Sequence, residues 1–237
     1  RRHRRVSASR DVGDLGTVIA MDVLVIGGHG KVALRLLRLL AQQGHRGRGV
    51  IRRADQAGDL EAAGAEPVLC DLERGADLRP HIGTANAFVF AAGAGPGSGP
   101  KRKRTVDYGA AVKSMEVASE LGVSRFVIVS SIGTHDVDGA SEVMRPYLQA
   151  KRDADDALKQ SGLDWTIVKP GHLTNAPGSG RVEINRTFGR RGDVPRYDVA
   201  LVLLECLQAP TTIGVEFELF EGDVPARDAV RSLSEAD

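Results

Sequence analysis

Cysteines and long apolar runs are what this sequence has least of. Its two cysteines, Cys70 and Cys206, form neither a C-x-x-C motif nor the spacing of a metal site. We therefore expect no bound metal and a reduced protein, which is typical of the cytoplasm. No apolar run approaches the roughly 20 residues that a membrane-spanning helix needs, so we expect no membrane partner either.

The first 20 residues lack apolar periodicity and the apolar core of a secretory signal. They hold five arginines and two aspartates, a net charge of +3, and since the whole chain carries +1, residues 21–237 carry −2. Arginine and serine are typical of a transit peptide, but Asp11 and Asp14 argue against one. We predict an extension outside the fold over residues 1–20, a natural start at Met21, and one domain over residues 21–237. A slightly acidic domain argues against general binding of nucleic acid.

A strand, a glycine turn and a helix are expected in succession from Met21 to Leu40. The strand, residues 22–26, is apolar and β-branched, and residues 32–40 are good helix formers. This order is typical of a dinucleotide-binding unit, whereas a glycine turn alone also fits a surface loop. Gly27 permits a tight reversal, and Gly30 has no Cβ to keep a pyrophosphate from the helix N-terminus. The residues expected to bind the phosphates are Gly27, His29, Gly30, Lys31 and Val32.

Strands and helices alternate along the rest of the chain. Further strands are expected over residues 45–53, 66–70, 87–91, 125–129, 164–168, 181–184 and 216–220, and helices over residues 54–63, 105–121, 145–161 and 197–207. This alternation predicts a single α/β domain, a Rossmann-type doubly wound parallel sheet with helices on both faces. Ligands of such sheets bind at the carboxyl ends of the strands.

No acidic residue ends the second predicted strand, where sites for NAD usually carry Asp or Glu. Arg52 and Arg53 stand there, and Asp55 lies beyond the strand end. A guanidinium can bind a 2′-phosphate through two parallel hydrogen bonds. We therefore expect NADP rather than NAD, with Arg52 as the main contact and Lys31 as an added positive charge. The alternative is that both arginines are solvated at the surface.

Tyr147 and Lys151 form a Tyr-x-x-x-Lys pattern that sets both side chains on one face of a predicted helix. An ammonium near a phenol favours the ionised phenol, and such a tyrosine can donate a proton to a carbonyl oxygen as hydride reaches the carbon. Lys151 can also hold the nicotinamide ribose. Ser131, at the end of the preceding strand, can donate a hydrogen bond to the same carbonyl oxygen. The pattern also arises by chance, but its position after Ser130 and Ser131 favours catalysis.

Together these segments resemble an atypical short-chain dehydrogenase/reductase, of the NAD(P)-binding group related to epimerases and to biliverdin/flavin reductases. The resemblance covers about residues 21–230. Its carriers are residues 25–32, Asp71-Leu72, Ala91–Gly93, Val106-Asp107, Gly109-Ala110, residues 125–131, residues 147–151, residues 162–171 and residues 197–200.

The resemblance implies further site residues. Asp71 and Leu72 would border the adenine, and Ala91, Ala92 and Gly93 would cover the cofactor. Pro170 and Leu173, which follow the sixth predicted strand at the ligand edge, are also expected to bind the cofactor, and His172, nearer the predicted nicotinamide, is a candidate substrate contact. Asp107 stands where the dehydrogenases usually carry a catalytic Asn, and a carboxylate donates no hydrogen bond unless protonated.

We therefore expect an NADP-binding oxidoreductase that transfers hydride between NADPH and a small carbonyl or similar acceptor, as a monomer or weak homodimer. The alternative is a non-enzymatic sensor that binds NADP(H) and acts through a protein partner. The Ser–Tyr–Lys set favours the enzyme, whereas Asp107 and the short sequence after Val182 favour the sensor. That short sequence also leaves little room for a sugar-nucleotide domain. The basic run Lys101–Arg104 fits a solvated loop better than a nucleic-acid patch, and it could attract an anionic substrate.

Overall fold

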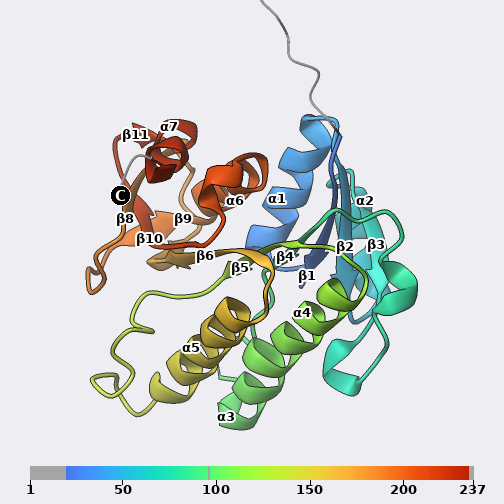
Figure 1. The fold of residues 1–237 in the computed structure, drawn as a ribbon, viewed down its shortest axis with the longest axis horizontal. Coiled ribbons are helices and arrows are strands. Elements are labelled where there is room, and N and C mark those ends of the chain that lie inside the picture. The colour runs from blue at the N-terminus through green and yellow to red at the C-terminus, as the bar shows by residue number, and fades with distance from the viewer. Residues whose placement is uncertain (1–19, 96, 235–237) are drawn as a thin grey trace, which may run out of the picture.

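The computed structural model describes residues 20–95 and 97–234, so all but the last residue of the extension predicted over residues 1–20 lies outside the described residues. Within them, nine strands form one sheet in the order β11-β8-β10-β6-β5-β4-β1-β2-β3 (Figure 1). The strands are β1 Asp22–Ile26, β2 Arg46–Ile51, β3 Glu66–Leu69, β4 Ala87–Phe90, β5 Arg125–Val129, β6 Asp164–Pro170, β8 Arg181–Asn185, β10 Val215–Glu221 and β11 Val224–Pro225. A separate pair joins β7 His172–Thr174 to β9 Asp193–Pro195.

The sheet is parallel from β3 through β10, and only β8 and β11 run antiparallel to their neighbours. The predicted doubly wound sheet is therefore confirmed, with an antiparallel margin that the sequence pattern did not specify. Because β1 to β6 are parallel, their carboxyl ends meet at one edge, where ligands bind in such folds.

Helices cover both faces of the sheet, as predicted. On one face lie α1 Lys31–Gln42, α6 Arg196–Gln208 and α7 Ala226–Arg231, and on the other α4 Ala111–Glu120 and α5 Arg145–Gln160 (Figure 1). Short helices are α2 Ala57–Glu61 and α3 Gly99–Arg102, and α3 continues into a π-helix, Lys103–Ala110. Single 3₁₀ turns cover Ala54–Gln56, Leu72–Arg74, Arg79–His81, Pro210–Thr212 and Ser232–Ser234. Among the described residues, no helix has the length and apolar character to cross a membrane.

Strand β1 shows how the core is divided. All five of its residues are buried, and alternate side chains point to opposite faces. Val23 and Val25 pack with α1 and α6, whereas Leu24 and Ile26 pack with α4 and α5. A strand that is apolar on both faces is what a covered parallel sheet requires.

Several elements differ from the sequence prediction. The sixth strand, expected to end before Pro170, includes it as the last residue of β6. The helix expected from Thr105 begins earlier, with α3 at Gly99. The short strands β7 and β9, the edge strand β11 and helix α7 were not predicted, because three or fewer strand residues or a single helical turn carry no readable periodicity.

Both margins of the sheet carry a proline. Pro67 lies in β3, which pairs only with β2, and Pro225 lies in the two-residue strand β11, which pairs only with β8. The Cys70 amide donates to β2, and the Ala226 amide donates to Gly180 beside β8. Since successive nitrogens alternate in direction, both proline nitrogens face outward, away from the sheet.

Candidate functional site

The glycine turn after β1 needs glycine for steric reasons. Gly27 has a φ of +83°, and a Cβ there would lie 2.7 Å from Cα of Ala92. Gly30 is the N-cap of α1, so no side chain caps the first amides of the helix. Those amides and the positive end of the helix dipole are free to bind an anion, and this donor set fits a pyrophosphate.

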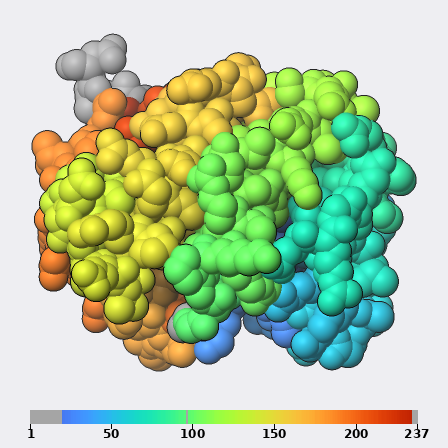
Figure 2. Space-filling view, turned by 90° about the horizontal axis from the view of Figure 1, so that it is seen from below, coloured from blue at the N-terminus to red at the C-terminus, as the bar shows by residue number. Residues whose placement is uncertain are grey.

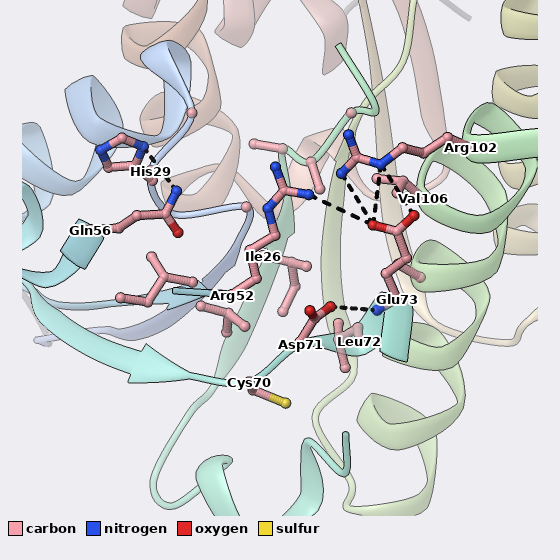
Figure 3. A pocket seen from close by; sticks show the side chains of 18 residues that line it. Ile26, His29, Arg52, Gln56, Cys70, Asp71, Leu72, Glu73, Arg102 and Val106 are labelled. Atoms are coloured by element: carbon pink, nitrogen blue, oxygen red, sulfur yellow. Dashed lines mark hydrogen bonds and ion pairs between the residues drawn. The ribbon is translucent and has the colours of Figure 1, made fainter. Parts of the chain in front are cut away.

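A pocket of about 260 Å³ opens at the carboxyl ends of β1 to β4 (Figure 3). Nine of the predicted cofactor residues line it, and they come from four separate turns. They are Gly27, His29, Gly30, Arg52, Asp71, Leu72, Ala91, Ala92 and Gly93. The structure thus brings the predicted phosphate, ribose and adenine residues to one cavity.

Five other predicted cofactor residues do not line this pocket. Lys31 is exposed in the first turn of α1, and the Val32 side chain is buried in the core beneath that helix. Pro170 is buried at the end of β6, and Leu173 lies half-buried in β7. Lys151 lies next to the pocket, as described below.

Residues that sequence reasoning missed complete the lining. They are Ile26, Val50, Ile51, Gln56, Cys70, Glu73, Arg102, Val106 and Ala110. Arg102 belongs to the basic run expected to be a solvated loop, and Glu73 follows the predicted adenine residues directly. Cys70 is buried, and burial raises the pKa of its thiol, which disfavours the reactive thiolate.

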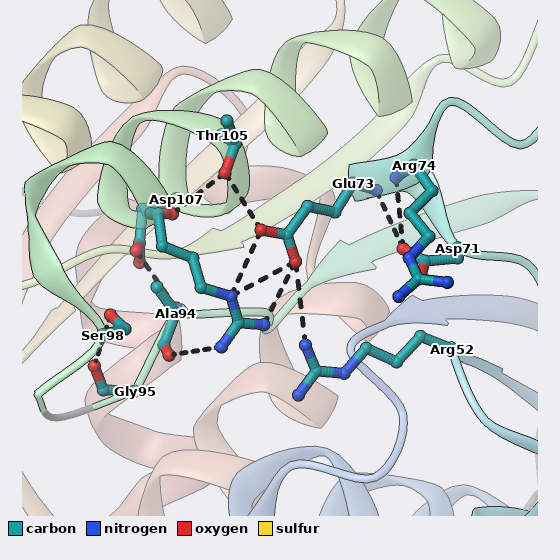
Figure 4. Close-up of polar contacts among 10 residues, drawn as sticks. Arg52, Asp71, Glu73, Arg74, Ala94, Gly95, Ser98, Thr105 and Asp107 are labelled. Atoms are coloured by element: carbon teal, nitrogen blue, oxygen red, sulfur yellow. Dashed lines mark hydrogen bonds and ion pairs between the residues drawn. The ribbon is translucent and has the colours of Figure 1, made fainter.

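Three charged side chains meet at the mouth of the pocket (Figures 3 and 4). Arg102 donates to the Glu73 carboxylate from Nε at 3.2 Å and from Nη2 at 3.1 Å. Arg52 Nη1 lies 3.7 Å from the same carboxylate, which is longer than a hydrogen bond. The hydrogen bond from Arg102 holds the pKa of Glu73 below its usual value, so this carboxylate is anionic at neutral pH.

The neighbouring polar side chains have separate partners. Asp71 Oδ1 accepts from the amides of Glu73 and Arg74 and so caps the 3₁₀ turn after β3. His29 Nε2 lies 2.7 Å from Oδ2 of Asp59, a residue of helix α2. Arg53, which is exposed after β2, pairs with Asp55 at 2.9 Å and does not line the pocket. Of the two neighbouring arginines, Arg52 is therefore the one that faces the pocket.

The basic run Lys101–Arg104 is helical rather than a loop, and three of its four side chains contact other parts of the fold. Besides the Arg102 contact, Lys103 donates to the carbonyl of Gly95 at 2.6 Å, and Arg104 pairs with Asp153 of α5. In Figure 2 the green segment that contains α3 and the π-helix lies between the teal segment after β3 and the yellow segment of α5. The run therefore joins the pocket to the helix that carries Tyr147.

Lys151 is buried and reaches the edge of the pocket. Its Nζ donates to the carbonyls of Val129 at 3.0 Å and Ala92 at 3.4 Å. It also lies 3.4 Å from Oδ1 of Asp107, a side chain with no exposed surface. Asp107 Oδ2 accepts from the amide of Ala94, so the aspartate ties the lysine to the loop expected to cover the cofactor.

Tyr147 lies in the first turn of α5 and is half-buried. The Lys103 ammonium stands 5.1 Å from the centre of its ring. Within the described residues no group forms a hydrogen bond with the Tyr147 hydroxyl, which leaves it free for a substrate. Ser131 is partly buried directly after β5, and His172, on β7, is exposed with its Nδ1 3.2 Å from Asp193.

A second buried acid lies one turn beyond Lys151 on α5. Asp155 Oδ2 accepts from the Ser130 hydroxyl at 2.7 Å and lies 3.7 Å from the ammonium of Lys169. Its Oδ1 is buried without a hydrogen-bond partner among the described residues. Burial outweighs both contacts and raises the pKa of Asp155 to about 6.

This shift predicts how stability depends on pH. The folded chain keeps the Asp155 proton up to about pH 6, whereas the unfolded chain loses it near pH 3.8. The contribution of Asp155 to the free energy of unfolding therefore decreases as the pH rises from 3.8 to about 6. Roughly two pKa units correspond to about 3 kcal/mol. We expect Asp155→Asn, which keeps an acceptor for Ser130, to gain about this much stability relative to wild type as pH rises through the window. Urea unfolding at pH 4, 5, 6 and 7 measures the difference.

Asp156→Asn is the matched control, because Asp156 is the next residue of α5 and is exposed. It should show no such trend. A stability difference between Asp155→Asn and wild type that stays constant with pH would mean that Asp155 titrates normally.

Known proteins are similar to this chain over the pocket and over helix α5. Residues 27–210 match a family model described as NAD(P)H-binding. The uncharacterized sugar epimerase YhfK of Bacillus subtilis is 36% identical over 215 residues, which are 90% of this chain and 100% of YhfK. A solved Bacillus halodurans structure, assigned by name to the NAD-dependent epimerase/dehydratases, is similar with a TM-score of 0.86 and 40% identity over 90% of this chain and 100% of that one. ChuY of Escherichia coli O157:H7, named an anaerobilin reductase, is similar with a TM-score of 0.72 and 25% identity over 86% and 98%.

Proposed function

Because this chain belongs to the NAD(P)H-binding family, as the resemblance drawn from its sequence predicted, we propose that it is an NADPH-dependent reductase of a small carbonyl compound or comparable electron acceptor. One observation carries the proposal. Ala92 lines the pocket, and its carbonyl accepts a hydrogen bond from the buried Lys151 of the Tyr-x-x-x-Lys pair. The pocket suited to a dinucleotide and the lysine of the Tyr-x-x-x-Lys pair therefore share one wall. We further propose that the protein works in the cytoplasm as a monomer or weak homodimer.

The residues present fit the dinucleotide. The uncapped amides at the start of α1 would hold the pyrophosphate, and the turns after β3 and β4 would enclose the adenine. Arg52, with its side chain about half exposed beside the pocket, would bind a 2′-phosphate. When bound, the reduced nicotinamide supplies the hydride.

The chain itself supplies the proton. In this proposal the Tyr147 hydroxyl donates its proton to the substrate oxygen, so that the carbonyl becomes an alcohol and solvent later reprotonates the phenolate. Ser131 donates a hydrogen bond to the same oxygen and orients it. Lys151, fixed by two carbonyls and Asp107, keeps a positive charge at this edge and favours the developing phenolate.

The second candidate is the NADP(H) sensor, and the Asp107–Lys151 contact favours it. A lysine engaged with a fully buried carboxylate is less available to a cofactor ribose than a lysine beside a neutral Asn. In that case the protein would bind NADPH and report its presence through a protein partner, without turnover.

Turnover distinguishes the two candidates. We expect the purified protein to oxidise NADPH when small aldehydes, diketones, quinones or free flavin are supplied one at a time, with one reduced product per NADPH. Loss of NADPH absorbance measures the rate, and chromatography identifies the product. A mixture without acceptor is the control. Tight NADPH binding with no acceptor-dependent oxidation would contradict the reductase and support the sensor.

A further inference from the structure

An anion of the protein itself stands where the proposed 2′-phosphate would bind. Glu73 lines the pocket between the two guanidinium groups that face it, those of Arg52 and Arg102 (Figure 3). The three come from distant parts of the chain, since Arg52 follows β2, Glu73 lies in the turn after β3, and Arg102 ends α3. The pocket therefore holds two cations and one fixed anion at its mouth.

The two arginines are held unequally. Arg102 makes a fork of contacts to Glu73, and its Nη1 also lies 3.4 Å from the carbonyl of Ala94. Thr105 donates to the other side of the same carboxylate at 3.1 Å, so Glu73 cannot easily turn away (Figure 4). Arg52 lies 3.7 Å from the carboxylate and makes no hydrogen bond to it. Arg52 is thus free to bind another anion, and Arg102 is not.

A 2′-phosphate that reaches Arg52 must therefore approach the Glu73 carboxylate. Like charges brought together reduce affinity, and a 2′-hydroxyl carries no charge to be repelled. An acidic side chain at this position also offers an acceptor to a ribose hydroxyl, as acids at the end of the second strand do in sites for NAD. The same carboxylate thus acts differently on the two dinucleotides.

We propose that Glu73 is a specificity-determining residue, whose carboxylate competes with the 2′-phosphate for the pocket arginines and limits the preference for NADPH over NADH. This inference rests on the proposed binding of NADPH. It assigns the preference to a balance between Arg52, which raises it, and Glu73, which lowers it.

Calorimetric titration of wild type and Glu73→Gln with NADPH and NADH tests the proposal without turnover. We expect Glu73→Gln to raise NADPH affinity roughly 10-fold and to leave NADH affinity unchanged or lower. Adenosine 2′,5′-bisphosphate and 5′-AMP, which lack the nicotinamide, should reproduce this difference. Glu73→Asp keeps the charge and should give no gain.

Glu66→Gln is the matched control, because Glu66 starts β3, the strand that precedes Glu73, pairs with Arg46 and lies outside the pocket. It removes the same charge and should leave both affinities unchanged. If Glu73→Gln binds NADPH no better than wild type, or gains as much affinity for NADH, the inference about Glu73 is wrong and Glu73 only supports Arg102. The proposed function is not affected by that result. A wild type that binds neither dinucleotide overturns the proposed function as well.

Discussion

Replacing Tyr147 with phenylalanine should lower the turnover of a carbonyl acceptor by roughly 10²–10⁴-fold, the usual effect of a positioned general acid. NADPH affinity should change little, because the hydroxyl that is removed has no partner among the described residues and the ring is retained. Initial rates at saturating NADPH, together with NADPH binding measured separately, give the two quantities.

Tyr197→Phe is the control for this substitution. Tyr197 lies near the start of α6 and is partly exposed, and it lies outside the pocket, so its hydroxyl should not affect turnover. If Tyr147→Phe turns over as fast as wild type, Tyr147 is not the acid. The remaining choices would then be the sensor or a flavin-type reduction that requires no tyrosine acid.

Arg52→Ala should weaken NADPH binding by roughly 10- to 150-fold, since a hydrogen bond to a charged group contributes about 1.5–3 kcal/mol. NADH affinity should be nearly unchanged, because NADH has a hydroxyl where NADPH has the phosphate. The substitution also leaves Glu73 without one of its two cations, which adds to the repulsion of the 2′-phosphate. Titration of the wild type and Arg52→Ala with NADPH and with NADH gives the ratio of the two affinities in each protein.

Arg53→Ala provides the comparison, because Arg53 neighbours Arg52 but pairs with Asp55 away from the pocket. It should leave both affinities close to wild type. Equal affinities of the wild type for NADPH and NADH would contradict the NADP preference. A preference that survives in Arg52→Ala would instead assign it to another residue.

The centre of the sheet was predictable from sequence because its strands, such as β1 and β4, are buried on both faces. Four apolar residues in β1, a tight turn that requires glycine and a run of helix formers specify the order of elements locally. The pocket followed from the same order, because parallel strands bring their carboxyl ends together. Nine predicted residues line it for that reason.

The contacts between side chains were not predictable, because they join residues far apart in the chain. Glu73 and Arg102 are 29 residues apart, and nothing near either residue signals the pairing. Asp107 could be recognised as a departure from the usual Asn, but its contact with Lys151 depends on how the π-helix packs against α5. The raised pKa of Asp155 arises from burial, which no spacing of acidic residues reveals.

The prolines at the two margins of the sheet bear on how the protein behaves at high concentration. Leu69 of β3 is 56% exposed beside Pro67, and an apolar, hydrogen-bonding strand there would be a template for fibrous aggregation. Pro67 has no N–H to offer along this margin, and at the other margin Pro225 ends a strand of only two residues. Copies of the described domain are therefore poorly suited to join edge to edge into a continuous sheet. Crowded molecules should stay dispersed, or meet through helices and loops.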